Sequence, residues 1–239
     1  MRVQAYFVGW RDLYYLPFVK KHYGSFCERL VLYDQFSTDG TVELALELGF
    51  EVRSFGDPKE FDELCRIQVK NNCWKESRDL GVDYVIVADA DEFVTIPLGM
   101  KASLPRVVGL NMMSRDLPKE DIFEIKNGRP YNVYAKQAVF CPERIREINF
   151  TPGCHRCSPV GEISREGAPA TMFHYAQIGG PEKEAQRHKI YGSHLGEKAR
   201  EGNFGSHYLI PEVEKRSIWE SSLSICPELW MEPLFEENP

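Results

Sequence analysis

The sequence predicts an α/β fold built on a mostly parallel central sheet flanked by helices. Over the first ninety residues, short apolar runs alternate with amphipathic stretches in the order strand, helix, strand, helix, strand, helix, strand. This order is typical of a doubly wound sheet. The run at 84–88, YVIVA, is rich in β-branched residues, as expected of a strand buried on both faces. It leads directly into three carboxylates, Asp89, Asp91 and Glu92.

The elements of the first half follow in order. The expected strands are 2–8, 30–33, 51–55 and 84–88. The expected helices are 13–23, 41–48 and 59–78. Good N-cap residues precede the second helix at Ser37, Thr38 and Asp39. The buried stripe of that helix is expected at Val42, Ala45 and Leu46. The inward residues of the third helix are expected to be Phe61, Leu64, Cys65 and Gln68.

After Phe93 the pattern changes to a mixed β half with long loops. The expected strands there are 107–113, 131–141 and 170–175. A first C-terminal helix is expected at 182–191, and the acidic tail 225–239, with Trp230 and Phe235, is expected to lie across the surface. The pattern therefore predicts a single domain in three parts, 1–95, 96–180 and 181–239.

Composition narrows the function classes. The chain has 239 residues with 36 acidic and 29 basic side chains, and its net charge of −7 argues against a general affinity for nucleic acid or acidic membranes. No apolar run approaches the length of about 18 residues that a membrane span needs, and the N-terminus lacks a signal-peptide pattern. The seven cysteines are then expected to be reduced thiols in a cytoplasmic protein.

The acidic cluster predicts a metal or nucleotide site. Mutual repulsion makes Asp89, Asp91 and Glu92 costly at the end of a buried strand, and a hard cation such as Mg²⁺ or Mn²⁺ would remove that cost. Ligands of open α/β sheets bind outside the carboxyl ends of the strands, where this cluster falls. In an extended segment Asp89 and Asp91 point to the same side. The alternative is a solvated turn of surface acids.

Four further positions in the first half are candidates for ligand binding. Trp10 and Arg11 break the chain after the first strand, where they could meet a base and a phosphate; alternatively, Trp10 packs under the next loop. Asp34 ends the second strand, where its carboxylate could accept a hydrogen bond from a ring N–H. Asn72 lies in the unusually polar second half of the third helix, which favours either a ligand contact or a solvated face.

The helix at 182–191 carries several basic residues. Lys183, Arg187 and Lys189 could fold over phosphate groups as a lid, although an ordinary solvated basic face explains them equally well.

With these motifs identified, the chain resembles the GT-A-fold glycosyltransferases of the family-two-like group, in particular small enzymes of bacteria and large DNA viruses. The stretch 33–41, YDQFSTDGT, is similar to the group's Asp-Asn-x-Ser-x-Asp-Gly-Thr, with Gln35 where Asn is usual. The stretch 85–93, VIVADADEF, is similar to its Asp-x-Asp-Glu-Phe strand end. Weaker similarity lies at 148–155 and 173–175, so the resemblance covers roughly residues 2 to 190.

The resemblance implies a GT-A fold, a nucleotide-binding half at 1–95 and an acceptor-side half at 96–180. It implies a nucleotide-sugar donor, often a UDP-sugar, held with Mn²⁺ or Mg²⁺. Asp34 would hold the base, and Asp89 the ribose or a metal-bound water. Asp91 would ligate the metal, and His174 would complete the metal shell.

The expected reaction transfers a hexosyl or deoxyhexosyl group to a hydroxyl of a glycan or glycoprotein acceptor, with inversion. No sharp motif marks the catalytic base. The candidates are His155 and Glu162, the latter directly after Gly161.

Two other classes stay open. An Asp-dependent phosphatase also places Asp-x-Asp after a strand, but it requires Thr or Val two residues after the second Asp, where this chain has Phe93. A non-catalytic sugar-nucleotide or metal-binding module is the second, and Cys154 and Cys157 have the Cys-x-x-Cys spacing of a zinc site. The preferred interpretation of these two cysteines is structural thiols or an acceptor-site loop.

Overall fold

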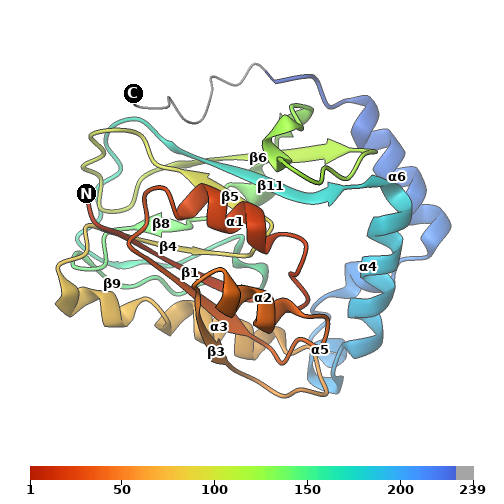
Figure 1. Ribbon diagram of the computed structural model, residues 1–239, viewed down its shortest axis with the longest axis horizontal. Helices are drawn as coiled ribbons and strands as arrows, with labels where there is room; N and C mark the ends of the chain where they lie inside the picture. Colours follow the sequence, from red (N-terminus) through yellow and green to blue (C-terminus); the bar gives the residue numbers. More distant parts are fainter. Residues whose placement is uncertain (230–239) are drawn as a thin grey trace.

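The computed structural model describes residues 1–229 and has a mixed α/β fold (Figure 1). Its first sheet has the strand order β3-β2-β1-β4-β8. The bounds are β1 Val3–Gly9, β2 Arg29–Asp34, β3 Glu51–Ser54, β4 Tyr84–Ala88 and β8 Val139–Phe140. The first four strands run parallel, and β8 pairs antiparallel with β4. The predicted parallel sheet is therefore confirmed.

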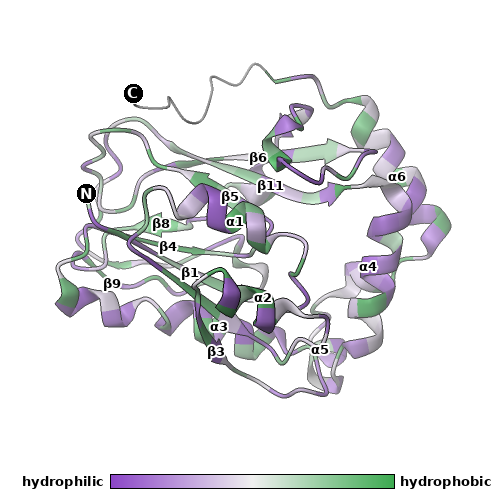
Figure 2. Cartoon of the chain, in the orientation of Figure 1, coloured by the Kyte–Doolittle hydropathy of each residue, from purple (hydrophilic) through white to green (hydrophobic). Residues whose placement is uncertain are grey.

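Helices cover both faces of this sheet. The side chains of Val3, Ala5 and Phe7 in β1 pack with α1 (Leu16–Tyr23) and α2 (Thr41–Glu47) on one face. Tyr6 of β1 points to the opposite face and packs with α3 (Glu63–Asn72) and Trp74. Strands β1, β2 and β4 are largely buried on both sides, which explains their near-continuous apolar sequences, whereas β3 at the edge is partly exposed. Figure 2 shows hydrophobic residues along these strands and hydrophilic stretches on the outer helices.

A second sheet has the order β5-β11-β6-β7. Its bounds are β5 Glu92–Thr95, β11 Ala170–Ile178, β6 Val107–Ser114 and β7 Gly128–Pro130. β11 runs antiparallel to β5 and parallel to β6, while β7 runs antiparallel to β6. A short pair, β9 (Ile145–Glu147) and β10 (Val160–Gly161), stands apart from both sheets. Short 3₁₀ helices join these strands at η2 (Ile122–Glu124), η3 (Asn132–Tyr134) and η4 (Pro152–Cys154).

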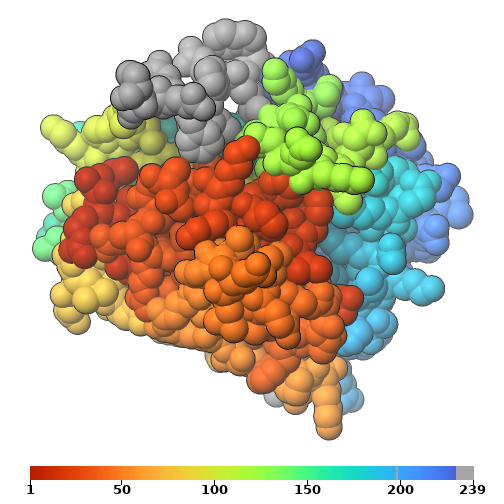
Figure 3. All heavy atoms as spheres, viewed as in Figure 1, coloured from red at the N-terminus to blue at the C-terminus, as the bar shows by residue number. Residues whose placement is uncertain are grey.

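Three C-terminal helices stand beside the carboxyl ends of the strands (Figure 1). They are α4 (Gly180–His194), α5 (Glu197–Glu201) and α6 (Glu212–Ser224), with the 3₁₀ helix η5 (Ser206–Leu209) between α5 and α6. In the space-filling view, the N-terminal residues form a continuous surface and the C-terminal helices pack along one side of it (Figure 3). The tail expected at 225–239, including Trp230 and Phe235, lies mostly outside the described residues.

Several details of the sequence-based assignment are wrong. The expected helix 59–78 divides into α3 and the 3₁₀ helix η1 (Lys75–Leu80), and its buried side chains are Arg66, Ile67 and Lys70. Leu64, expected inward, is 40% exposed. Leu46 of α2 is 58% exposed, and Gly40 in a left-handed conformation caps that helix in place of Ser37, Thr38 or Asp39. Of the expected strand 131–141, only β8 forms.

Within residues 1–229, no helix is both long enough and apolar enough to cross a membrane.

Candidate functional site

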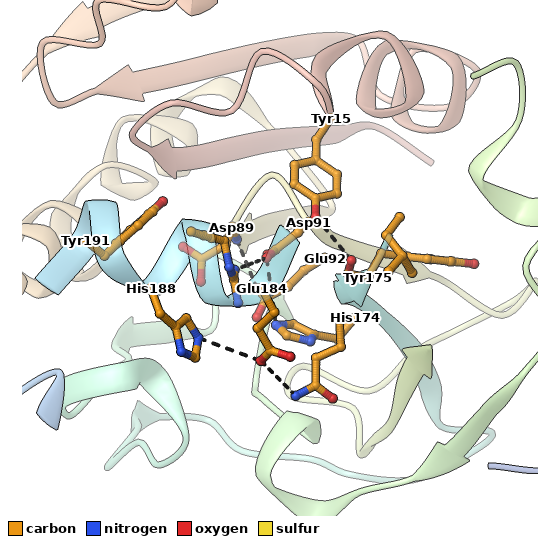
Figure 4. A network of polar contacts seen from close by, with 12 residues as sticks. Tyr15, Asp89, Asp91, Glu92, His174, Tyr175, Glu184, His188 and Tyr191 are labelled. Atoms are coloured by element: carbon orange, nitrogen blue, oxygen red, sulfur yellow. Dashed lines mark hydrogen bonds and ion pairs between the residues drawn. The ribbon is translucent and has the colours of Figure 1, made fainter. Parts of the chain in front are cut away.

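Asp89, labelled in Figure 4, follows β4 directly, and three cationic side chains contact it. Its Oδ1 accepts hydrogen bonds from Lys70 Nζ at 2.6 Å and from Arg66 Nη2 at 3.2 Å, and its Oδ2 accepts one from Lys136 Nζ at 3.3 Å. Burial alone would raise the pKa of Asp89, but Lys70, Lys136 and Arg66 outweigh it and hold the pKa well below its usual range. Asp89 is therefore a permanent anion at the centre of a basic cluster.

The cations reach Asp89 because α3 turns a charged face inward. Asp62 caps the helix by accepting a hydrogen bond from Cys65 N, and Arg66 and Lys70 then lie one turn apart on the same side. Arg66 Nη2 also donates to Val8 O at the end of β1, at 2.8 Å, which joins the helix to the sheet. These two side chains are only 9% and 5% exposed.

Glu92 holds the turn between Asp89 and β5. Its Oε2 accepts a hydrogen bond from Asp89 N at 2.9 Å, and its Oε1 lies 2.5 Å from Lys136 Nζ. Burial raises the pKa of Glu92 despite the opposing effect of Lys136. The third carboxylate of the motif thus has partners within the fold and shapes the turn.

Asp91 faces the other way, toward α4 and β11. Its Oδ2 lies 4.0 Å from His174 Nε2 and 3.5 Å from Arg187 Nη1. His174 stacks on Tyr134 with ring centroids 3.8 Å apart, and burial lowers its pKa to about 4, so it is neutral at pH 7. The backbone fixes the pair, because Tyr175 N, next to His174, donates to Asp91 O at 2.9 Å.

These groups can hold a divalent metal ion. Across the described residues, Asp91, Glu92 and His174 form one group whose potential ligand atoms lie within 4.8 Å of one another. A neutral imidazole is the form that binds metal, and the ring nitrogen of His174 that faces Asp91 is Nε2. Since Glu92 is engaged by Lys136 and Asp89 N, Asp91 and His174 fit the role of metal ligands best. The mixed oxygen and nitrogen set suits Mn²⁺ better than Mg²⁺.

A cavity of about 610 Å³ lies between α4 and the ends of β1, β4 and β11. Asp89, Asp91, Lys70 and Lys136 line one part of it. The other part is lined by residues of β11, α4 and α6, including Gln177, Glu184, His188, Lys215 and Trp219.

Two buried guanidinium donors in this cavity have no acceptor. Arg66 Nη1 and Arg187 Nε are both shielded from solvent and lack hydrogen-bond partners among the described residues. An unsatisfied buried donor costs on the order of 1–3 kcal/mol, and more when it is charged. Both residues line the cavity, so an anionic ligand there would pair with the positive charge of their guanidinium groups.

Five of the predicted site residues line the cavity. They are Asp89, Asp91, His155, His174 and Arg187. His155 is exposed at the rim, and its Nδ1 lies 2.7 Å from Val133 O. Partial desolvation of the ring, with Lys136 nearby, lowers the pKa of His155.

The residues predicted to hold the base do not line the cavity. Trp10 is 8% exposed and packs against Phe61 and Tyr191, with ring centroids 6.1 and 5.1 Å away. Arg11 is exposed, with its backbone N–H bonded to Ser37 Oγ. Asp34 accepts hydrogen bonds from Ser37 N and Ser37 Oγ at 2.7 and 2.5 Å, so both its oxygens stabilise the turn after β2.

The remaining candidates also lie elsewhere. Asn72 is exposed and donates to Gln68 O within α3. Lys189 and Glu162 are exposed outside the cavity. Lys183 links α4 to Tyr15, the residue that precedes α1, since its Nζ donates to Tyr15 Oη at 3.3 Å. Burial lowers the pKa of Lys183 to about 8.

Sequence reasoning missed several ionisable residues of the cavity. They include Arg66, Lys70, Lys136, Glu184 and His188. For Arg66 and Lys70 there was a usable signal, since the two are spaced four apart on a helix preceding the Asp-x-Asp strand. Lys136 lies in a stretch expected to be strand, and no pattern marks it.

Cys154 and Cys157 carry no sign of a zinc site. Burial raises the pKa of both thiols and so favours the protonated form, whereas zinc binds the thiolate. In the part of the chain that the structure describes, neither belongs to a group of three or more potential metal ligands.

Comparison with known proteins does not assign this chain to a family. No protein-family model matches the sequence, and no curated protein matches it. One similar solved structure is described as the crystal structure of a mycobacterial protein, with a TM-score of 0.37 and 13% identity. The match covers 74% of this chain and 66% of that one, so this chain spans slightly less than two thirds of its length. A likeness at this level carries no argument about function.

Proposed function

We propose that the chain is a metal-dependent glycosyltransferase of GT-A type, which transfers a sugar from a nucleoside-diphosphate sugar, a UDP-sugar in the first instance, to an acceptor hydroxyl. The observation that supports this most directly is that the guanidinium residues Arg66 and Arg187 line the same cavity as Asp89 and Asp91. A diphosphate offers several anionic oxygens to such donors.

The charged residues have separate roles in this proposal. Asp91 and His174 would hold Mn²⁺ or Mg²⁺, which as a Lewis acid stabilises negative charge on a departing diphosphate. Arg66, Lys70 and Arg187 hold the diphosphate by charge and hydrogen bonds. Asp89 keeps the cations of α3 in place, because its oxygens are already occupied by Lys70, Arg66 and Lys136.

The place of the nucleoside differs from the one that the sequence suggested. Trp10 is covered by Phe61, Tyr191 and His194, whose ring centroid lies 4.9 Å from that of Trp10. In this proposal the base of the nucleotide binds in the part of the cavity lined by Phe61, Tyr191 and Leu195, which pack around Trp10.

Thermal unfolding tests this proposal. The protein is heated with UDP, GDP, CMP or ADP, each with Mn²⁺ and with EDTA. We expect stabilisation by one diphosphate only when the metal is present. The matched variants are Asp91→Asn, which should lose this shift, and Asp79→Asn on the exposed surface, which should keep it. A shift of equal size in EDTA, or in Asp91→Asn, would contradict the metal assignment, and no shift with any nucleotide would contradict the donor site.

A further inference from the structure

The second part of the cavity contains a buried carboxylate that the metal and diphosphate do not use. Glu184 of α4 is 8% exposed and lines the cavity with Gln177 of β11 and His188 of α4. Figure 4 shows His188 pointing toward Glu184. A buried carboxylate is costly unless it has partners or a ligand. Helix α4 has further attachments to the core, such as the hydrogen bond that Tyr191 Oη donates to Trp10 O.

Both neighbours of Glu184 contact the same oxygen. Its Oε1 accepts a hydrogen bond from Gln177 Nε2 at 3.2 Å and lies 3.7 Å from His188 Nε2. Among the described residues, no hydrogen bond to Oε2 is formed. The side chain is therefore held by one oxygen, while the other remains for a ligand in the cavity.

The elements that hold Glu184 are the ones that hold the metal ligands. Arg187, three residues later on α4, reaches Asp91 at 3.5 Å. On β11, His174 and Gln177 would point to opposite faces of a regular strand, but the pairing with β6 shifts register between them. This irregularity allows both to line the cavity. Glu184 thus adjoins the donor site without contacting its metal ligands.

We infer that Glu184 is the general base that accepts the proton of the acceptor hydroxyl, and that Gln177 and His188 position it. This rests on the proposed function. The acceptor oxygen forms a bond to the anomeric carbon, the bond from that carbon to the diphosphate oxygen breaks, and its electron pair leaves with the diphosphate. The hydroxyl proton moves to Glu184 Oε2. Attack opposite the leaving group inverts the anomeric configuration.

The chemical setting suits a base. Burial raises the pKa of Glu184, opposed by Arg187, the hydrogen bond from Gln177, Lys215 of α6 and Lys183. A carboxylate with a raised pKa is a stronger base. His188 is neutral at pH 7, since burial with Arg187, Lys215 and His207 nearby lowers its pKa to about 3.

The test uses water as the acceptor, so that the natural acceptor is not needed. The release of nucleoside diphosphate is measured from UDP-glucose, UDP-galactose and UDP-N-acetylglucosamine with Mn²⁺, or from the corresponding sugars of another base if that diphosphate gives the thermal shift. We compare the unmodified protein with Glu184→Gln, Glu184→Asp and Glu182→Gln. Glu182 lies on the same helix, but its side chain is 67% exposed outside the cavity.

We expect Glu184→Gln to keep the metal-dependent thermal shift with the diphosphate and to lose release at least about a hundredfold, the usual contribution of a general base. Its pH profile should lack the fall in rate toward low pH that protonation of Glu184 produces in the unmodified protein. Glu184→Asp should recover part of the rate, and Glu182→Gln should match the unmodified protein.

The outcomes separate the two proposals. Release within a few-fold of normal in Glu184→Gln, with the same pH profile, would overturn the base assignment and leave the donor site intact. Binding of diphosphate without release by the unmodified protein would do the same. No binding of any nucleotide by the unmodified protein would overturn the proposed function, and this inference with it.

Discussion

At the scale of single residues, the two aspartates of one motif behave differently. Asp89 accepts hydrogen bonds from three cations, whereas Asp91 meets a neutral imidazole and the end of Arg187. The sequence predicts both as ligands because they point to the same side of an extended segment. The difference comes from Arg66, Lys70 and Lys136, which lie 23, 19 and 47 residues away in the chain. A local motif cannot encode partners at such distances.

The first residue-scale prediction concerns Asp89→Asn. The change removes the anion and leaves buried cations without compensation, which typically costs about 3–5 kcal/mol. The control is Asp83→Asn, whose side chain is 55% exposed and accepts a hydrogen bond from Arg2 N; its loss should be about 1 kcal/mol or less. Urea unfolding measures both. Equal losses would show that the Asp89 cluster contributes no more than a surface pair.

The second residue-scale prediction concerns His22 of α1. Its side chain is 1% exposed, and its Nε2 lies 2.9 Å from Val94 O. Burial lowers its pKa to about 4, against the opposing effect of the Val94 hydrogen bond. Between pH 6.5 and pH 4 the unfolded chain binds a proton that the folded chain does not, so stability falls as the pH falls through this window. From pH 7 to pH 5 the loss from this residue should be about 2 kcal/mol.

Unfolding in urea at pH 7 and pH 5 measures this loss. His22→Gln should lose correspondingly less stability over the same interval, while the other buried histidines keep the rest of the pH dependence. The same pH dependence in the variant and the unmodified protein would contradict the assignment.

At the scale of elements, the sequence predicts helices and strands better than it predicts their buried faces. Helix α3 was expected to bury Leu64 and Gln68, because apolar spacing marks the inward stripe of most helices. Instead it buries Arg66 and Lys70, since Asp89 compensates their charge. The apolar pattern predicts the wrong buried face for α3 because charged residues of the site are buried there in place of apolar core residues. Such a mismatch between pattern and burial marks a candidate site.

Helix α6 provides the element-scale prediction. Trp219 is 1% exposed, packs with Met113, and donates from Nε1 to Gln177 O at 3.1 Å, whereas its neighbour Ile218 is 49% exposed. Trp219→Ala should cost about 3–5 kcal/mol through the cavity it leaves. Ile218→Ala should cost about 1 kcal/mol or less. Urea unfolding of the two variants compares them. Similar costs would mean that α6 does not dock through Trp219.

At the scale of the whole molecule, the parallel sheet was predictable and the second sheet was not. Strands β1 to β4 follow one another along the chain, and β1, β2 and β4 each have a local apolar signature. The second sheet instead joins β5, β6 and β11, and the pairing of Val107 with Ala170 spans more than sixty residues. Such pairing leaves no periodic trace in the sequence. The cavity is formed where this sheet and α4 meet the first sheet. Its far end, with Glu184, could therefore not be predicted from the sequence either.

The net charge of −7 likewise conceals the character of the site. The net charge does not exclude an anionic small ligand, because an average over the whole chain says nothing about the charge of one cavity. Arg66, Lys70, Lys136 and Arg187 gather there although acidic residues outnumber basic ones overall.

The most direct test of the account is anomalous diffraction from crystals grown with Mn²⁺ and the nucleoside diphosphate that stabilises the protein. The account predicts a manganese peak bonded to Asp91 and His174, with the diphosphate between it and the guanidinium groups of Arg66 and Arg187. A diphosphate bound elsewhere, or one bound in the cavity with no manganese at Asp91, would contradict it.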